Sequence, residues 1–218
     1  MSDSSDTPRA RRTGLRRSVL SLSVVNIFEM AIQVVLPMVL VRLLSDSDFG
    51  LYRTLWLIAI TCSGALALGM PGSLYYFLPR NKPAKSTVYV IQAAGFMALA
   101  GLVAALGTAA FVFWHETGHA IGWGSVPFVG LWVFASLLDF FFTSQQAVPT
   151  QARVNLSFAL MRIVLVMTAA IVFGNWPAVL AAQLVFVGLK AIVCSICVAG
   201  YGHPSVKSTR QSWREQLT

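Results

Sequence analysis

Four ionisable side chains lie inside long apolar blocks of the sequence, where a charge is costly. Glu29, Asp139, Arg162 and Lys190 each fall near the middle of a block rich in Val, Ile, Leu, Ala and Phe. A charge at the centre of a membrane helix costs roughly 2.5–3.5 kcal/mol, so such residues usually face a protein interior. Carboxylates can hold a cation, and the two bases can hold an anion. We therefore expect a polar or anionic substrate, or a coupling cation, to meet these residues.

Helical spacing places other polar residues on the same faces as the charges. At about 100° per residue, Asn26, Glu29 and Gln33 form one polar stripe. Asn155 aligns with Arg162 in the same way, and the blocks of Asp139 and Lys190 carry comparable stripes. Facing stripes predict a cavity halfway across the bilayer. Its expected lining is Asn26, Glu29, Gln33, Asp139, Arg162 and Lys190. The alternative is a closed structural network in which the two acids neutralise the two bases.

A second chemical pattern is the run H-E-T-G-H at residues 115–119. Two His at i and i+4 of a helix can hold Zn²⁺, with the Glu as general base. This form resembles the intramembrane site-2 metalloproteases, which implies His115, Glu116 and His119 as an alternative metal site. However, no glycine follows Asp139 to complete the L-D-G segment that supplies a third ligand. We favour a solvated loop, and the sequence predicts no enzyme activity, no resident metal and no cofactor.

Composition and block length identify the elements that must position these residues. The 218 residues are 56% hydrophobic and 11% charged, whereas soluble domains contain about 25% charged residues. Lipid cannot satisfy backbone polar groups, and the blocks lack the alternating pattern of barrel strands, so each must be a helix. We predict an all-α polytopic membrane protein with a six-helix transmembrane bundle. The six blocks are about 19–41, 50–70, 86–114, 127–148, 154–173 and 177–201.

The distribution of Lys and Arg predicts the orientation of the bundle. One side of the six-span arrangement has only Arg42 and Arg53, and both termini are therefore expected in the cytoplasm. The predicted cytoplasmic side holds Arg9, Arg11, Arg12, Arg16, Arg17, Arg80, Lys82, Lys85, Arg153, Lys207, Arg210 and Arg214. Because these bases border apolar blocks, the net charge of +8 favours lipid headgroups rather than nucleic acid as the anionic partner.

The chain divides into three expected segments. Residues 1–17 are polar and basic, which predicts a disordered cytoplasmic tail. Residues 18–201 form the six-span transmembrane bundle. Residues 202–218 form a cytoplasmic segment that looks like the lead-in to a seventh span, and we expect the chain to be truncated there.

The turn between the first two blocks is the most distinctive stretch. Ser45 and Asp48 have the spacing of a helix N-cap, and Gly50 removes bulk where two helices leave a tight hairpin. The run R-L-L-S-x-x-D-F-G-L-Y, after an apolar block with Asn26, resembles the N-terminal signature of polysaccharide-biosynthesis membrane proteins. These are lipid-linked oligosaccharide flippases of the multidrug/oligosaccharidyl-lipid/polysaccharide exporter superfamily. The signature residues are Arg42, Asp48, Phe49, Gly50 and Tyr52.

The resemblance implies a transporter of the bacterial inner membrane. Such proteins have two six-helix lobes around a central cavity and move an undecaprenyl-pyrophosphate-linked glycan to the outer leaflet by alternating access. Cationic residues in that cavity hold the anionic headgroup, and by position Arg162 and Lys190 are the candidates. Six spans correspond to the N-terminal lobe. The expected partners are membrane lipids, the lipid-linked glycan, and a second lobe, separate chain or second copy. A non-transporting assembly partner is the remaining alternative.

Overall fold

The computed structural model describes residues 27–28, 30–32, 34–80, 83–144 and 148–200. Within these ranges the chain is helical and contains no strand, in agreement with the predicted all-α class. An apolar helical segment, Met30–Leu43, comes first. It is followed by α2 (Asp46–Leu66), α3 (Met70–Arg80), α4 (Pro83–Trp114), α5 (Glu116–Ile121), α6 (Ser125–Ala135), α7 (Leu137–Ser144), α8 (Val148–Phe173) and α9 (Trp176–Gly200).

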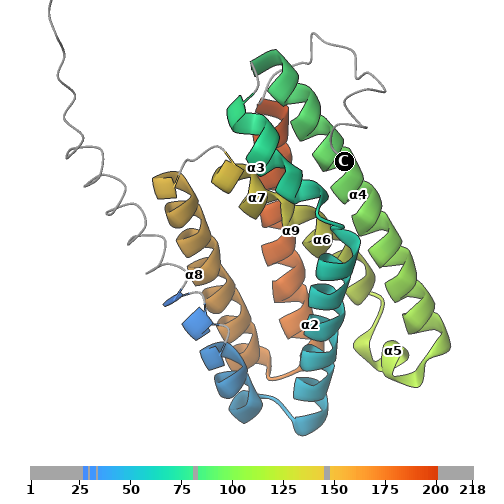
Figure 1. Cartoon of the computed structure of the whole chain (residues 1–218). Helices are drawn as coiled ribbons and strands as arrows, with labels where there is room; N and C mark the ends of the chain where they lie inside the picture. The colour runs from blue at the N-terminus through green and yellow to red at the C-terminus, as the bar shows by residue number, and fades with distance from the viewer. Residues whose placement is uncertain (1–26, 29, 33, 81–82, 145–147, 201–218) are drawn as a thin grey trace, which may run out of the picture.

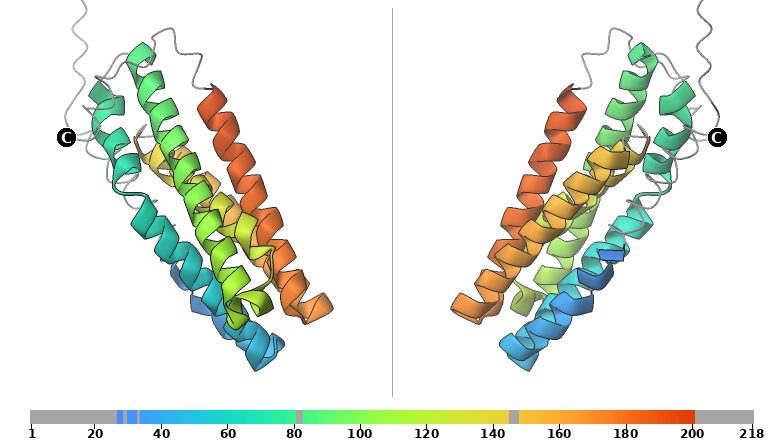
Figure 2. Two further views of the ribbon diagram at one scale, coloured as in Figure 1. Left: turned by 90° about the vertical axis from the view of Figure 1, so that its right-hand side faces the viewer. Right: turned by 90° about the vertical axis from the view of Figure 1, so that its left-hand side faces the viewer.

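Five stretches in the described ranges are long and apolar enough to cross a membrane. They are Asp46–Leu66, Ser86–Trp114, Ser125–Ser144, Thr150–Phe173 and Trp176–Gly200. The long helices share one general direction, as a bilayer-spanning bundle requires (Figure 2). The protein is therefore a multi-pass membrane protein. The first predicted span, 19–41, begins outside the described residues, and its described part belongs to the helical segment before α2.

The hairpin before α2 follows the predicted capping pattern. Ser45 is the N-cap of α2, and its Oγ accepts a hydrogen bond from the backbone N–H of Asp48 at 3.2 Å. The two carboxylates of the first turn, Asp46 and Asp48, lie at the positive end of the helix dipole. The helix consequently begins four residues before the predicted boundary at Gly50, because the cap permits a polar first turn.

The fourth predicted span, 127–148, is divided into two helices. The chain passes from α6 to α7 at Ser136. Here the N–H of Asp139 donates to the Ser136 carbonyl at 3.2 Å, three residues back instead of the four of an α-helix. The Ser136 hydroxyl bonds back to the Val133 carbonyl at 2.7 Å. A serine that bonds to its own helix commonly bends it. Asp139 therefore lies in the first turn of α7, where the helix dipole favours a negative charge.

The second predicted span, 50–70, also ends in a break. Leu68 and Gly69 both have positive φ, +46° and +72°, between α2 and α3. This conformation suits glycine and is uncommon for leucine. The break separates α2 from α3, so that α3 packs against α4 and α7 while α2 packs against α6. The two helices therefore have different main neighbours, although both also contact α4.

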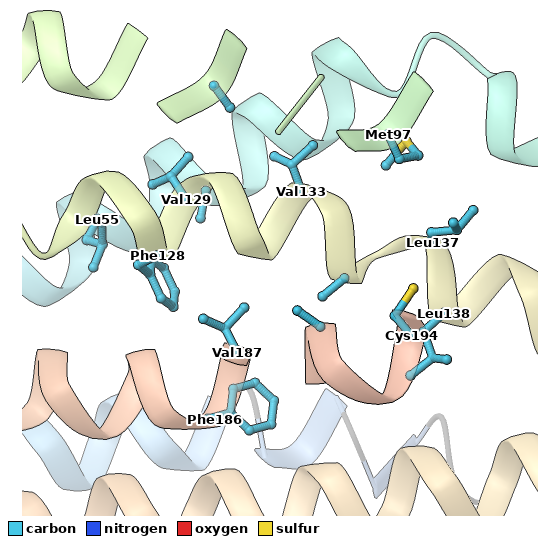
Figure 3. Close-up of a cluster of buried hydrophobic side chains, with 14 of the residues drawn as sticks. Leu55, Met97, Phe128, Val129, Val133, Leu137, Leu138, Phe186, Val187 and Cys194 are labelled. Atoms are coloured by element: carbon cyan, nitrogen blue, oxygen red, sulfur yellow. The ribbon is translucent and has the colours of Figure 1, made fainter. Parts of the chain in front are cut away.

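The apolar core lies around α6. This helix packs against α4 on one side and α9 on the other. Figure 3 shows Phe128 and Val133 of α6 with Met97 of α4 and Val187 of α9, all nearly or fully buried. The outer surface carries many exposed Leu, Ile and Val side chains, which suits contact with lipid tails. Hydrophobic side chains thus fill the centre and also cover the perimeter.

The helices α4 and α6 are in close contact where Gly101 and Gly130 face each other. A Cβ atom added to Gly101 would lie 2.6 Å from the carbonyl oxygen of Gly130. Real Cβ atoms do not approach an oxygen so closely, so Gly101 is required by packing. Small residues that let helix backbones come together are a general device of membrane bundles.

Candidate functional site

A cavity of about 440 Å³ lies between α8 and the rest of the bundle. We call it the arginine cavity. Figure 1 shows α8 and the helical segment 30–43 on one side, with α2, α6 and α9 on the other. Its lining residues come from that segment and from α2, α3, α6, α7, α8 and α9. They are Ile32, Trp56, Ile60, Tyr75, Trp132, Asp139, Phe140, Thr143, Gln151, Asn155, Phe158, Ala159, Arg162, Phe186 and Lys190.

Three of the predicted cavity residues line this space. Asp139, Arg162 and Lys190 come from α7, α8 and α9, and their side chains meet at the same cavity. Arg162 is buried, and Asp139 and Lys190 are partly buried. The other three predicted residues, Asn26, Glu29 and Gln33, lie outside the described residues.

Asp139 and Lys190 form an ion pair. The Lys190 Nζ donates to Oδ2 of Asp139 at 3.0 Å and to Oδ1 at 3.2 Å. The lysine side chain is 12% exposed, whereas the carboxylate is 42% exposed. Lys190 Nζ also lies 5.8 Å from the ring centroid of Trp132. Because the carboxylate has more acceptor sites than one ammonium fills, Asp139 can still accept hydrogen bonds from a ligand.

Arg162 is held by two aromatic residues of α2. Its Nη2 donates to the Tyr52 hydroxyl at 3.3 Å, and its Cζ lies 4.0 Å from the ring centroid of Trp56. Arg162 is only 7% exposed, and its Nε is buried without a hydrogen-bond partner. A stacked guanidinium is stabilised by the aromatic quadrupole while its N–H groups stay directed in the plane. Such a group can bind an anion such as phosphate.

Polar side chains continue along α8 from Arg162. Gln151 donates through Nε2 to the Thr143 hydroxyl at 2.6 Å, and its own Oε1 is buried without a partner. Asn155 lines the cavity one helical turn from Gln151, on the face that the spacing with Arg162 predicts. The Nε of Arg162 and the Oε1 of Gln151 are thus a buried donor and a buried acceptor without partners, and both residues line one cavity. Burying such a group costs free energy unless a ligand or water forms a hydrogen bond with it.

The charge of the arginine cavity is positive within the described residues. Two bases, Arg162 and Lys190, line it with one carboxylate, Asp139, which leaves a formal charge of +1. Asp139 and Lys190 form the one ion pair recorded for the described part of the chain. Arg162 has no carboxylate partner there. The predicted pairing of an acid with a base is present for Asp139 and Lys190. Glu29, the second acid of the predicted network, lies outside the described residues, and Arg162 donates a hydrogen bond to Tyr52.

The signature turn supplies one residue to this site. Arg42 and Gly50 are exposed near the turn, and Asp48 serves the helix cap. Phe49 stacks on Tyr52 at a centroid distance of 6.3 Å. Tyr52 is 4% exposed and reaches Arg162. The signature therefore builds a hairpin that places Tyr52 one turn before Trp56.

The sequence contained an unused signal for this side of the cavity. Tyr52, Trp56, Ile60, Ser63 and Ala67 follow each other at intervals of four, four, three and four residues, which defines one face of a helix. Trp56 and Ile60 line the arginine cavity, and the Tyr52 hydroxyl accepts a hydrogen bond from Arg162. Because tyrosine and tryptophan are usual in apolar spans, their spacing alone does not mark this face as part of a polar site. The same holds for Trp132 and Tyr75.

The H-E-x-x-H run has a different conformation from a zinc helix. His115 is extended, with φ −116° and ψ 134°, and α5 begins only at Glu116. Its ring stacks on Phe111 at 5.2 Å. The first histidine is therefore outside the helix that would place it beside His119. Within the described ranges, no three His, Cys, Asp or Glu side chains are grouped to hold a metal ion.

Comparison with known proteins supports one family. Residues 15–218 match the family described as polysaccharide biosynthesis protein. No curated protein and no solved structure gives a significant match to the chain. The family match covers nearly the whole sequence, including the signature turn and all three described charges of the arginine cavity. The chain belongs to the polysaccharide biosynthesis protein family.

Proposed function

We propose that the chain is one lobe of a flippase that moves a lipid-linked oligosaccharide precursor across the bacterial inner membrane. The family and the apolar helices fit a membrane transporter-like role. The finer assignment is supported by Arg162, a buried cation without a carboxylate partner in the described residues, at the wall of a cavity within a membrane bundle. A buried cation of this kind attracts an anion, and the diphosphate that joins the lipid to the glycan is one.

The proposed arrangement is a bundle of six spans with both termini in the cytoplasm. The first span comprises residues 19–41, and a second lobe, a separate chain or a second copy closes the cavity for alternating access. This topology is supported by the distribution of Lys and Arg along the sequence. Membrane lipids and the lipid-linked glycan are the proposed partners.

The proposed roles of the three charged residues differ. Arg162 binds the diphosphate, because its guanidinium presents several donors in one plane. Lys190 adds a second positive charge when Asp139 releases it. Asp139 holds Lys190 while the cavity is empty and can accept a coupling cation. The ion pair thus keeps Lys190 neutralised until an anion replaces the carboxylate.

Binding of a polyprenyl diphosphate to the chain in nanodiscs tests the proposal. Arg162→Gln removes the charge and leaves a shorter polar side chain. Loss of a charge-assisted hydrogen bond costs roughly 1.5–3 kcal/mol, or about ten- to hundred-fold in affinity. Arg153→Gln, an exposed arginine of the same helix, is the matched control and should bind normally. Equal affinity of the Arg162 variant and the wild type would contradict the proposal.

A non-transporting assembly partner is the second candidate. It is favoured by the Asp139–Lys190 pair, because a closed bundle needs its charges matched. In that case Arg162→Gln would leave lipid binding unaltered, and apolar replacement of both paired residues would preserve the protein's cellular role. Export assays in cells that depend on the complete transporter distinguish the two candidates.

A further inference from the structure

A second cavity, of about 510 Å³, adjoins the arginine cavity. We call it the glycine cavity. The two share the wall formed by Ile60, Trp132, Asp139, Phe140 and Lys190. The opposite wall comes from the end of α2 and the start of α3 and includes Gly64, Gly69 and Gly72. The Asp139–Lys190 pair therefore stands between two spaces, one of which contains Arg162.

The small residues of the glycine cavity are not explained by helix packing. A Cβ atom at Gly64 or Gly72 would meet nothing within 4 Å, whereas one at Gly101 would collide with the Gly130 carbonyl. Gly69 is needed for its positive φ, but Gly64 and Gly72 lie in helices with ordinary backbone angles. A side chain introduced at Gly64 or Gly72 therefore has room to extend beside the shared wall.

The shared wall offers the groups that bind a neutral polyol. Asp139 is 42% exposed and can accept from hydroxyl groups. Ser136, also at this cavity, donates its hydroxyl to Val133 and keeps its lone pairs for a donor. The indole of Trp132 supplies an apolar surface for the C–H face of a sugar ring. Few polar groups on a largely apolar wall, around a volume of roughly 300–1,000 Å³, are typical of small-molecule sites.

We propose that the glycine cavity is the subsite for the first sugar of the lipid-linked glycan. This inference rests on the proposed function, in which Arg162 binds the diphosphate in the neighbouring cavity. The first sugar is bonded directly to the diphosphate, so its subsite must adjoin the phosphate site. The shared wall at Asp139 and Trp132 meets that requirement. The substrate class is a polyprenyl diphosphate carrying at least one hexose.

The test compares two lipids on the chain in nanodiscs. One is a polyprenyl diphosphate, and the other is the same lipid carrying one N-acetylhexosamine. Gly64→Leu fills the glycine cavity without a clash at Cβ, and we expect about ten-fold weaker binding of the sugar-bearing lipid, with the bare lipid unchanged. Gly107→Leu is the control, because Gly107 is exposed on α4 with equal room at Cβ and lines neither cavity.

The outcomes separate the subsite from the proposed function. Arg162→Gln should weaken binding of both lipids, and if it weakens neither, the proposed function fails. If Gly64→Leu leaves the sugar-bearing lipid unaffected while Arg162→Gln weakens both, the sugar subsite alone is overturned. Ser136→Ala removes one hydroxyl without adding bulk and should lower the affinity of the sugar-bearing lipid selectively. Equal loss for both lipids in Gly64→Leu, with no selectivity in Ser136→Ala, also overturns the subsite.

Discussion

The hydroxyl of Tyr52 accepts a hydrogen bond from the guanidinium of Arg162, 110 positions later in the chain, at 3.3 Å. This bond joins the signature turn to the one described cavity base that has no carboxylate partner. It also orients the guanidinium, because Trp56 lies against its face at 4.0 Å. The signature turn is thus connected directly to the proposed binding residue.

Tyr52→Phe should remove the hydrogen bond that orients Arg162 and keep the aromatic ring. Loss of one bond to a buried cation costs about 1–3 kcal/mol, and we expect a lower unfolding temperature and several-fold weaker binding of polyprenyl diphosphate. Thermal unfolding in detergent and lipid binding in nanodiscs measure the two effects. Tyr76→Phe is the matched control, because Tyr76 is exposed on α3 and lines neither cavity. An equal effect of both substitutions would argue against a special role for Tyr52.

The Asp139–Lys190 pair should behave as a coupled unit in unfolding experiments. Asp139→Leu leaves a mostly buried ammonium without its partner, and we expect a loss of about 1–2 kcal/mol. The loss stays below the roughly 3–5 kcal/mol of fully buried pairs because the carboxylate is 42% exposed. Asp139→Leu combined with Lys190→Leu should recover most of the stability. A double-mutant cycle measures the coupling, and additive losses would refute it.

Gly101→Ala should destabilise the bundle by separating α4 from α6. The new methyl group would lie 2.6 Å from the Gly130 carbonyl, a backbone atom that cannot rotate away. Overpacking of this kind costs about 1–3 kcal/mol. Gly107→Ala, on the same helix with open space at Cβ, should be neutral or stabilising, since alanine favours helix. Chemical denaturation of the two variants in parallel checks the difference.

The H-E-x-x-H run should not hold zinc. His115 is extended and stacked on Phe111, so the two histidines do not project from one helix face. We expect His115→Ala and His119→Ala to leave the metal content of the purified protein unchanged, as measured by elemental analysis. Stoichiometric zinc that disappears in either variant would restore the metalloprotease alternative.

The proposed topology can be checked by labelling single cysteines in intact cells. After replacement of Cys62, Cys194 and Cys197, we expect Ser47→Cys and Asn175→Cys to react with an impermeant thiol reagent from outside. Ser47 is exposed in the first turn of α2, and Asn175 is exposed between α8 and α9. Arg153→Cys, on the predicted cytoplasmic side, should react only after permeabilisation. The reverse pattern would invert the proposed orientation.

The sequence was sufficient to locate the helices, because each helix satisfies its own backbone hydrogen bonds. Lipid forces this local solution on any long apolar block. The block 86–114 was therefore located correctly from hydropathy alone. The boundaries shifted where side chains altered the backbone. Ser45 extended α2 by capping it, and Ser136 divided the predicted fourth span into α6 and α7.

The sequence by itself determined which faces of three helices are polar. It therefore predicted Asp139, Arg162 and Lys190 as cavity residues. Helical period is a property of one segment, so it needs no knowledge of neighbours. Only the tertiary structure decided which groups meet. Asp139 forms an ion pair with Lys190, whereas Arg162 donates a hydrogen bond to Tyr52 and stacks on Trp56. The rotation and crossing of separate helices set these pairings, and they depend on packing such as that between Gly101 and Gly130, which no single segment specifies.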